Sequence, residues 1–223
     1  MRRWGRRRGW SSPRNKEDGL REIASKGQLR LAYLRWAVVT VPFVLLLGFT
    51  SARLVPSGSS NPWYVALIKP DNMPPEWAFP LAWTVIYVLM GLALAMIINA
   101  RGSTLRGPAL ALFAVQMAAN LAWTPIFFGM HQVFTAFVVV GVLGVLVFAT
   151  MLLFGRIRMG AALLLVPYLA WVGYAGFLLY QINELNPNAA SLVSAGGSEQ
   201  IQIDEDSVLV DDGNDSGTVT NAD

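Results

Sequence analysis

Five long apolar runs constrain the fold of this chain more than any other feature. They extend over Leu34–Thr50, Ala78–Ala100, Gly107–Phe128, Val133–Phe154 and Met159–Tyr180. The last four are long enough to cross a hydrocarbon core of about 30 Å as helices, and the first is close to the lower limit. Because an open backbone cannot be hydrated inside a bilayer, helices are the expected state of all five. The sequence therefore predicts an all-α integral membrane protein, a bundle of five transmembrane helices.

The charged residues are segregated along the chain. Residues 1–35 contain eleven of the 17 Lys and Arg, and residues 184–223 contain nine of the 14 Asp and Glu. Apart from Glu17, Asp18 and Glu22 in the amino-terminal part, the remaining charges fall between the apolar runs, and 54% of the chain is hydrophobic. This distribution predicts a basic tail over 1–33, a transmembrane domain over 34–186 and an acidic tail over 187–223. Both tails are too polar to bury a core, so we expect them to be disordered.

The Lys and Arg of the short connections predict the orientation in the membrane. Arg101, Arg106, Arg156 and Arg158 would lie on the same side as the basic amino terminus, whereas the connection between the third and fourth runs has no Lys or Arg. The positive-inside rule then places the amino terminus in the cytoplasm. Five spans place the carboxyl terminus on the opposite side. We expect a bacterial membrane, given the polar tails and compact connections.

Two features of the amino-terminal part allow other interpretations. Trp4 and Trp10 are interleaved with arginines, a pattern that also occurs in nucleic-acid-binding segments. Attraction to anionic lipid headgroups explains the same residues, so we expect no nucleic-acid partner. The first run could instead be a signal peptide cleaved near Ser51, but the polar leader before it is far longer than a normal n-region.

Aromatic residues and prolines are concentrated between Trp63 and Tyr87, in the sequence WYVALIKPDNMPPEWAFPLAWTVIY. The link from Ser51 to Glu76 is long and opens with flexible residues, so it is predicted to fold over the helix ends as a lid-like loop between the first two helices. Trp83 and Tyr87 lie one turn apart on a face that Gly91 extends. These rings suggest the wall of a pocket for a flat apolar ligand. The alternative is an interfacial aromatic belt with ordinary helix packing.

The third and fifth runs carry further candidate pocket residues. One stripe of the third run contains Gln116, Asn120, Trp123 and Phe127. Amides at membrane depth face a cavity or a neighbouring helix, so a pocket and an interhelical hydrogen bond both remain open. In the fifth run Ala175 lies one turn from Trp171, which makes either a notch beside a ring or a close helix contact.

Conventional catalysis and metal binding find little support in the sequence. There is no cysteine, the single histidine, His131, lies in a loop, and the apolar runs contain no paired carboxylates. Catalytic triads, multi-histidine metal sites and the usual proton relays are therefore excluded. We expect no obligatory cofactor and no metal. His131 as an axial haem ligand is the alternative to a plain interfacial loop residue.

Three motifs resemble the signatures of the tryptophan-rich sensory protein and translocator protein family, also called peripheral-type benzodiazepine receptors. The first comprises Trp63-Tyr64, Lys69-Pro70, Pro74-Pro75, Trp77, Phe79, Trp83 and Tyr87. The second extends from Gln116 through Asn120, Trp123 and Pro125 to Gly129, and the third is Pro167-Tyr168-Leu169-x-Trp171 with Ala175. The resemblance covers roughly residues 36–186.

This resemblance implies a five-helix receptor, usually a homodimer, that binds protoporphyrin IX, haem, sterols or synthetic benzodiazepine-like compounds in a pocket closed by the first loop. It implies a ligand-binding set of Trp63, Trp77, Trp83, Tyr87, Gln116, Asn120, Trp123, Phe127, Trp171 and Ala175. Light-dependent porphyrin degradation, with Trp63 and Trp171 as the candidate catalytic residues, and ligand transport are the alternative functions. Leu179 replaces a frequent Asn, and Glu184 lies near the basic position of the sterol motif after Tyr180, which argues against sterol recognition.

Overall fold

The part of the chain that the computed structural model describes, residues 26–192, is an all-helical bundle. Five of its helical segments are long and apolar enough to cross a membrane, which confirms the predicted fold class. The predictions for residues 1–25 and 193–223 lie outside the described residues. The elements are α2 (Lys26–Arg53), η2 (Gly58–Ser60), α3 (Pro62–Ala66), α4 (Ala78–Asn99), α5 (Arg106–Thr124), η3 (Pro125–Gly129), α6 (Val133–Ile157), α7 (Met159–Leu164), α8 (Val166–Leu185) and η4 (Ala189–Ser191).

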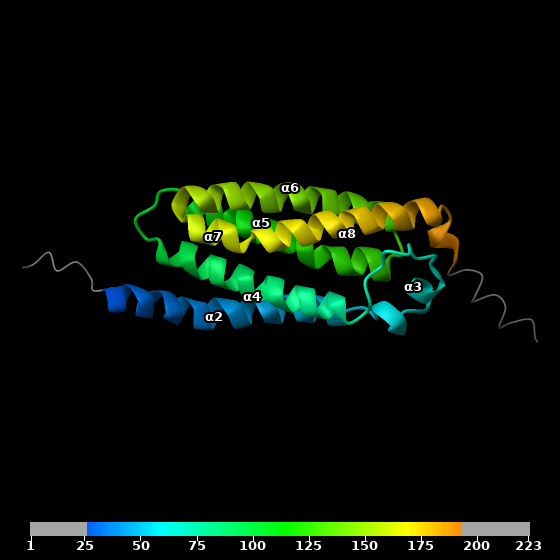
Figure 1. Cartoon of the computed structure of the whole chain (residues 1–223), viewed down its shortest axis with the longest axis horizontal. Coiled ribbons are helices and arrows are strands. Elements are labelled where there is room, and N and C mark those ends of the chain that lie inside the picture. The colour runs from blue at the N-terminus through cyan, green and yellow to red at the C-terminus, as the bar shows by residue number, and fades with distance from the viewer. Residues whose placement is uncertain (1–25, 193–223) are drawn as a thin grey trace, which may run out of the picture.

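The helices run alternately up and down the bundle, and its two ends carry different connections (Figure 1). α2 packs along α4, while α6 packs against both α5 and α8. The loop that carries α3 lies at the same end as the carboxyl end of α8. The short α4–α5 and α6–α7 connections lie at the opposite end, next to the start of α2.

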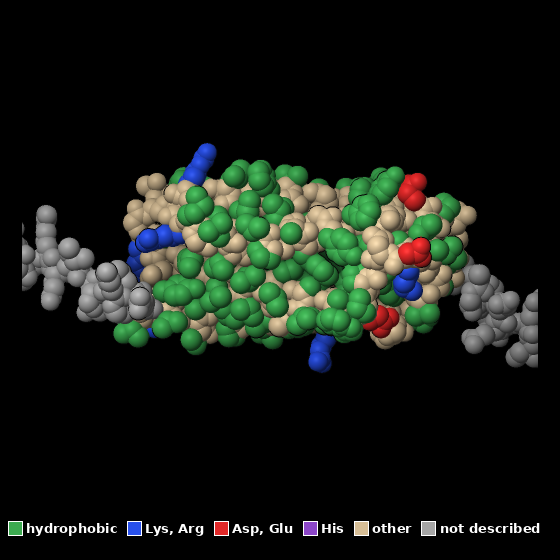
Figure 2. All heavy atoms as spheres, viewed as in Figure 1, with side chains coloured by type: hydrophobic (Ala, Val, Ile, Leu, Met, Phe, Trp, Pro, Cys, Tyr) green, Lys and Arg blue, Asp and Glu red, His purple; other side chains and the backbone are tan. Residues whose placement is uncertain are grey.

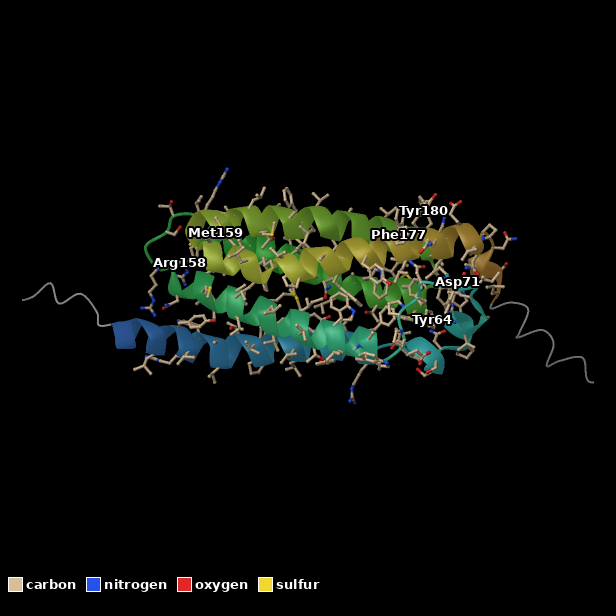
Figure 3. All side chains as sticks on the ribbon, in the orientation of Figure 1. Tyr64, Asp71, Arg158, Met159, Phe177 and Tyr180 are labelled. Atoms are coloured by element: carbon tan, nitrogen blue, oxygen red, sulfur yellow. The ribbon has the colours of Figure 1, made fainter. Side chains whose placement is uncertain are left out.

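Most charges of the described residues lie toward these ends, although one Lys or Arg side chain projects from the lower edge near the middle (Figure 2). Hydrophobic side chains cover most of the surface between the ends. Arg158 lies at the end of the bundle where the short connections are (Figure 3). Asp71 lies at the opposite end, in the long loop. A wide apolar band between two charged rims matches a hydrocarbon core between two headgroup layers.

The observed helix bounds differ from the predicted runs, most of all in the first and the fifth. α2 begins at Lys26 and ends at Arg53, rather than extending from Leu34 to Thr50. The fifth run is two helices, because α7 ends at Leu164 and α8 continues to Leu185. Hydropathy marks the part of a helix that suits hydrocarbon, and backbone hydrogen bonds continue beyond it into the interface.

Prolines explain why two runs are interrupted. Pro125 ends α5 and opens a π-helical turn, which Met130 closes by donating its N–H to the Pro125 carbonyl over 2.9 Å. Pro167 lies in the first turn of α8, where its missing N–H has no helical partner to lose.

Gly91 sets the close contact between α2 and α4. Its carbonyl accepts a hydrogen bond from Thr40 Oγ1 over 2.7 Å. A Cβ on Gly91 would lie 2.6 Å from the Cα of Val41, so the two backbones could not approach this closely with any other residue. Gly91 therefore faces α2, as does the Tyr87 ring, which lies against Gly48. Tyr87 lines the pocket described below, and Gly91 does not.

Candidate ligand-binding pocket

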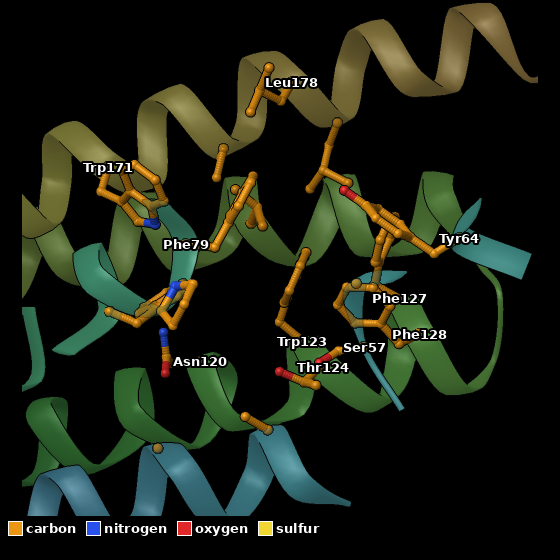
Figure 4. A pocket seen from close by; sticks show the side chains of 18 of the residues that line it. Ser57, Tyr64, Phe79, Asn120, Trp123, Thr124, Phe127, Phe128, Trp171 and Leu178 are labelled. Atoms are coloured by element: carbon orange, nitrogen blue, oxygen red, sulfur yellow. The ribbon is translucent and has the colours of Figure 1, made fainter. Parts of the chain in front are cut away.

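A pocket with a volume of about 400 Å³ lies beneath the long loop, between the ends of the helices. Small-molecule sites in proteins are typically about 300–1,000 Å³ and mostly apolar. The wall is built by α2, α4, α5, η3, α6 and α8, and the loop covers it. Figure 4 shows Trp171 and Leu178 of α8 on one side of this space and Asn120 and Thr124 of α5 on the other.

Most of the residues predicted to bind a ligand meet in this pocket. Trp83 and Tyr87 come from α4, and the others come from α5, η3 and α8. The predicted residues in the lining are Trp83, Tyr87, Asn120, Trp123, Phe127, Trp171 and Ala175. Three motifs that are far apart in the sequence thus form one site.

The other three predicted residues do not line the pocket. Trp63 is buried behind it, where its ring packs against Phe127 and His131. Trp77 is 67% exposed at the start of α4. Gln116 is buried one turn below Asn120, and within residues 26–192 neither atom of its amide has a hydrogen-bond partner.

Asn120 is held between two tyrosines from different helices. Its Oδ1 accepts from the Tyr87 hydroxyl over 3.2 Å, and its Nδ2 donates to the Tyr168 hydroxyl over 3.1 Å. Tyr168 is fully buried and does not line the pocket. The interhelical hydrogen bond and the pocket, which the sequence left as alternatives for Asn120, therefore both occur. This network joins α4, α5 and α8 at the pocket wall.

Aromatic rings make up the pocket walls in pairs. Trp83 stacks on Tyr87 with ring centroids 5.4 Å apart, and Trp123 stacks on Phe127 at 5.2 Å. Phe79 meets Trp171 edge to face at 5.8 Å, and Figure 4 shows these two rings on the same side of the cavity. Flat walls of this kind favour a flat, mostly apolar occupant.

The loop contributes the more polar part of the lining. Ser57, Gly58, Ser59, Tyr64, Met73 and Glu76 come from it, and Glu76 is the one charged side chain among the lining residues. The Tyr64 ring packs against the Phe128 ring, with centroids 5.4 Å apart, and Lys69 Nζ lies 4.6 Å from the centroid of the Tyr64 ring. Burial, and secondly the negative charge of Glu76, raise the pKa of Tyr64, so its hydroxyl stays protonated at neutral pH.

Comparison with known proteins identifies the family of this chain. Residues 38–185 match the TspO/MBR family, which is more than half of the chain. This chain belongs to the TspO/MBR family.

Relatives from bacteria and mammals share most of their length with it. It is 41% identical over 155 residues to the tryptophan-rich sensory protein of Cereibacter sphaeroides, covering 67% of this chain and 96% of the relative. It is 39% identical over 144 residues to the tryptophan-rich protein TspO of Chlorobaculum tepidum, covering 64% and 90%. The translocator protein of Ovis aries is 35% identical over 163 residues, covering 67% and 95%.

Some lining residues of this TspO/MBR protein could not be found by sequence reasoning. α2 contributes Gly48, Phe49 and Ala52, and no periodic pattern in this helix distinguishes them from lipid-facing neighbours. Phe79 and Tyr64 also line the pocket. Both belong to the first motif, but they were not among the predicted ligand-binding residues.

His131 is not placed to bind a haem in the pocket. Its ring lies 4.7 Å from that of Trp63, outside the lining. Within residues 26–192, no three His, Cys, Asp or Glu side chains cluster as metal ligands would.

Proposed function

We propose that this protein is a membrane receptor that binds porphyrins, such as protoporphyrin IX or haem, and similar planar apolar molecules beneath the long loop. The observation that supports it is the meeting of three aromatic motifs in one covered pocket. The ligand would lie between the Trp83–Tyr87 and Trp123–Phe127 pairs, with Trp171 and Ala175 of α8 along another edge. Each stacked ring would contribute about 0.5–1.5 kcal/mol beyond burial.

The names of the relatives support a sensory or translocating role. They describe the bacterial relative as a tryptophan-rich sensory protein and the mammalian one as a translocator protein. We propose that this protein senses a tetrapyrrole and regulates its handling or a stress response. In this proposal the protein is a homodimer in a bacterial membrane, with its amino terminus in the cytoplasm.

Pocket blocking tests the proposed site without removing a structural hydrogen bond. Ala175 lines the pocket, and Ala170 is exposed on the same helix. Ala175→Phe would fill the cavity, whereas Ala170→Phe adds the same ring to the outer face. Wild type and both variants, in lipid nanodiscs and in the dark, would be titrated with protoporphyrin IX while its absorption band is followed.

We expect saturable binding by wild type and Ala170→Phe, with affinity lowered at least about tenfold in Ala175→Phe because the ring occupies the ligand volume. Equal affinity in all three proteins would remove the pocket assignment. Absence of saturable binding by wild type would overturn the proposed ligand class.

The pocket also bears on light-dependent porphyrin degradation. Trp171 lines the cavity and Trp63 does not, so Trp171 is the member of the pair that would touch a bound porphyrin. Under light, Trp171→Phe should then slow any loss of the porphyrin absorption band while leaving binding largely intact. An unchanged rate of loss would exclude Trp171 as the donor.

A further inference from the structure

The loop over the pocket is tied to the segment that follows α8, by contacts that lie outside the pocket itself. Asn186, just beyond the end of α8, is buried with 8% of its surface exposed. Its Oδ1 accepts from the Ile68 N–H over 2.9 Å, and its Nδ2 donates to the Ile68 carbonyl over 2.9 Å. One side-chain amide therefore satisfies both backbone groups of a single loop residue.

A second tie lies three residues further along. Trp63 Nε1 donates to the Ala189 carbonyl over 2.8 Å, and both residues are buried. Ala189 belongs to η4, whose turn begins where Ala189 N–H donates to the Asn186 carbonyl over 3.1 Å. Asn186 and Ala189 thus form one short unit, which holds the loop at Ile68 and at Trp63.

The two halves of the loop are held differently. The first half is also anchored to the bundle by Asn61, whose Nδ2 donates to the Phe128 carbonyl over 3.0 Å, and by the rings around Phe127. From Ile68 onward, two side chains outside the loop donate to its backbone. Asn186 donates to the Ile68 carbonyl, and the Tyr174 hydroxyl donates to the Asn72 carbonyl over 2.9 Å. This second half carries Met73 and Glu76 of the pocket lining.

We propose that Asn186 is a positioning residue that clamps the second half of the loop shut, with Trp63 and Ala189 as the matching clamp on the first half. The inference rests on the proposed function for what the loop encloses. Asn186 does not line the pocket. It controls how readily a ligand enters and leaves, and it makes no contact with the ligand. Trp63 accordingly serves the site through its N–H, from behind the pocket.

The clamp can release because water can replace it as the hydrogen-bond partner of the loop backbone. The Ile68 side chain is largely exposed, so its backbone groups can bond to water once Asn186 releases them. Between Ile68 and Glu76 only Pro70 is buried, and Met73 packs against the core. Beyond the clamp and the Tyr174 bond to Asn72, few apolar contacts therefore oppose opening of this half of the loop. Regions that open locally are those with few buried apolar contacts.

Rapid mixing of protoporphyrin IX with nanodisc-embedded protein in the dark tests the clamp through tryptophan quenching. Asn186→Ala removes both bonds to Ile68, together with the bond that Nδ2 donates to the Ile182 carbonyl of α8 over 2.8 Å. Asn188→Ala alters an exposed residue of the same type two positions away. In Asn186→Ala we expect the association and dissociation rate constants to rise together, by about tenfold or more for the two lost bonds to Ile68, with a smaller change in Kd. Asn188→Ala should behave as wild type.

Trp63→Phe keeps an aromatic ring but loses the donor to Ala189 and part of the buried indole, so it should also speed both steps. A pocket residue behaves differently, because losing a ligand contact raises dissociation with little effect on association. An increase in dissociation alone in Asn186→Ala would therefore assign Asn186 to ligand contact and overturn the clamp. Unchanged rates in both variants would overturn it as well.

Hydrogen–deuterium exchange of the ligand-free protein separates this inference from the proposed function. Backbone amides from Leu67 to Met73 should exchange about tenfold faster in Asn186→Ala and unchanged in Asn188→Ala. That result would support the clamp even if protoporphyrin IX fails to bind. Equal exchange in wild type and Asn186→Ala would remove the clamp even if the porphyrin binds in the pocket.

Discussion

Single residues in the membrane interior show how differently two similar amides can be used. Asn120 has a partner for both polar atoms, and each partner is a tyrosine on another helix. Gln116, one turn away and equally buried, has none within residues 26–192. Spacing on one helical stripe makes the two amides look equivalent, but the partners on other helices decide what each one does.

Substitution by leucine should distinguish these two amides. Asn120→Leu leaves the Tyr87 and Tyr168 hydroxyls unpaired, so the free energy of unfolding should fall by about 1–3 kcal/mol. Gln116→Leu removes two unpaired atoms and should leave stability unchanged or raised. Thermal unfolding in nanodiscs, followed by intrinsic fluorescence, gives both values. A loss as large in Gln116→Leu as in Asn120→Leu would show that Gln116 has a partner.

At the scale of elements, prolines and glycines at particular places shape the bundle. Pro125 and Pro167 interrupt the third and fifth spans near the pocket, and Gly91 lets α2 lie directly on α4. The α2–α4 contact matters to the site because α2 supplies Gly48, Phe49 and Ala52 to the lining. A displaced α2 would open the pocket on that side.

Gly91→Ala should therefore destabilise the bundle. A Cβ 2.6 Å from the Val41 backbone forces the two helices apart, at a cost of about 1–3 kcal/mol. Gly141→Ala is the matched control, since its Cβ meets nothing within 4 Å and alanine favours helix. The thermal midpoint in nanodiscs should fall for Gly91→Ala alone, and a fall in both variants would point to a general intolerance of alanine.

At the scale of the whole molecule, charge and topology separate the two ends of the bundle. Arg101 and Arg158 lie in the short connections, and Arg106 and Arg156 lie in the helix turns beside them. The long loop lies at the opposite end, with the pocket beneath it. With the amino terminus in the cytoplasm, as proposed, the pocket would open toward the other side of the membrane.

Cysteine labelling can test this orientation directly, because the chain has no cysteine of its own. Thr104 and Ser60 are exposed at opposite ends of the bundle, in the α4–α5 connection and the long loop. In intact spheroplasts, a membrane-impermeant maleimide should label Ser60→Cys at once and Thr104→Cys only after permeabilisation. The reverse pattern would place the amino terminus outside.

Much of the architecture could be predicted from the sequence because membrane insertion is decided run by run. The apolar content of each segment determines whether it spans the membrane, and the arginines in and beside the short connections mark one end of the bundle. Five spans and a long covering loop could therefore be predicted without any knowledge of contacts. Trp83, Tyr87, Asn120 and Trp171 were also found as pocket residues, since aromatic and amide side chains recur there at helical spacing.

The sequence by itself determined the five spans, the position of the loop and the kinds of residue around the pocket, because these depend on local composition and periodicity. Only the tertiary structure decided how each helix is rotated about its axis and which distant residues meet. It turns Gln116 away from the cavity and brings Phe49 of α2 into it. It pairs Trp63 with Ala189, which are 126 positions apart, and Asn186 with Ile68, at a separation of 118. Such pairings have no local signature, since they follow from the packing of all five helices together.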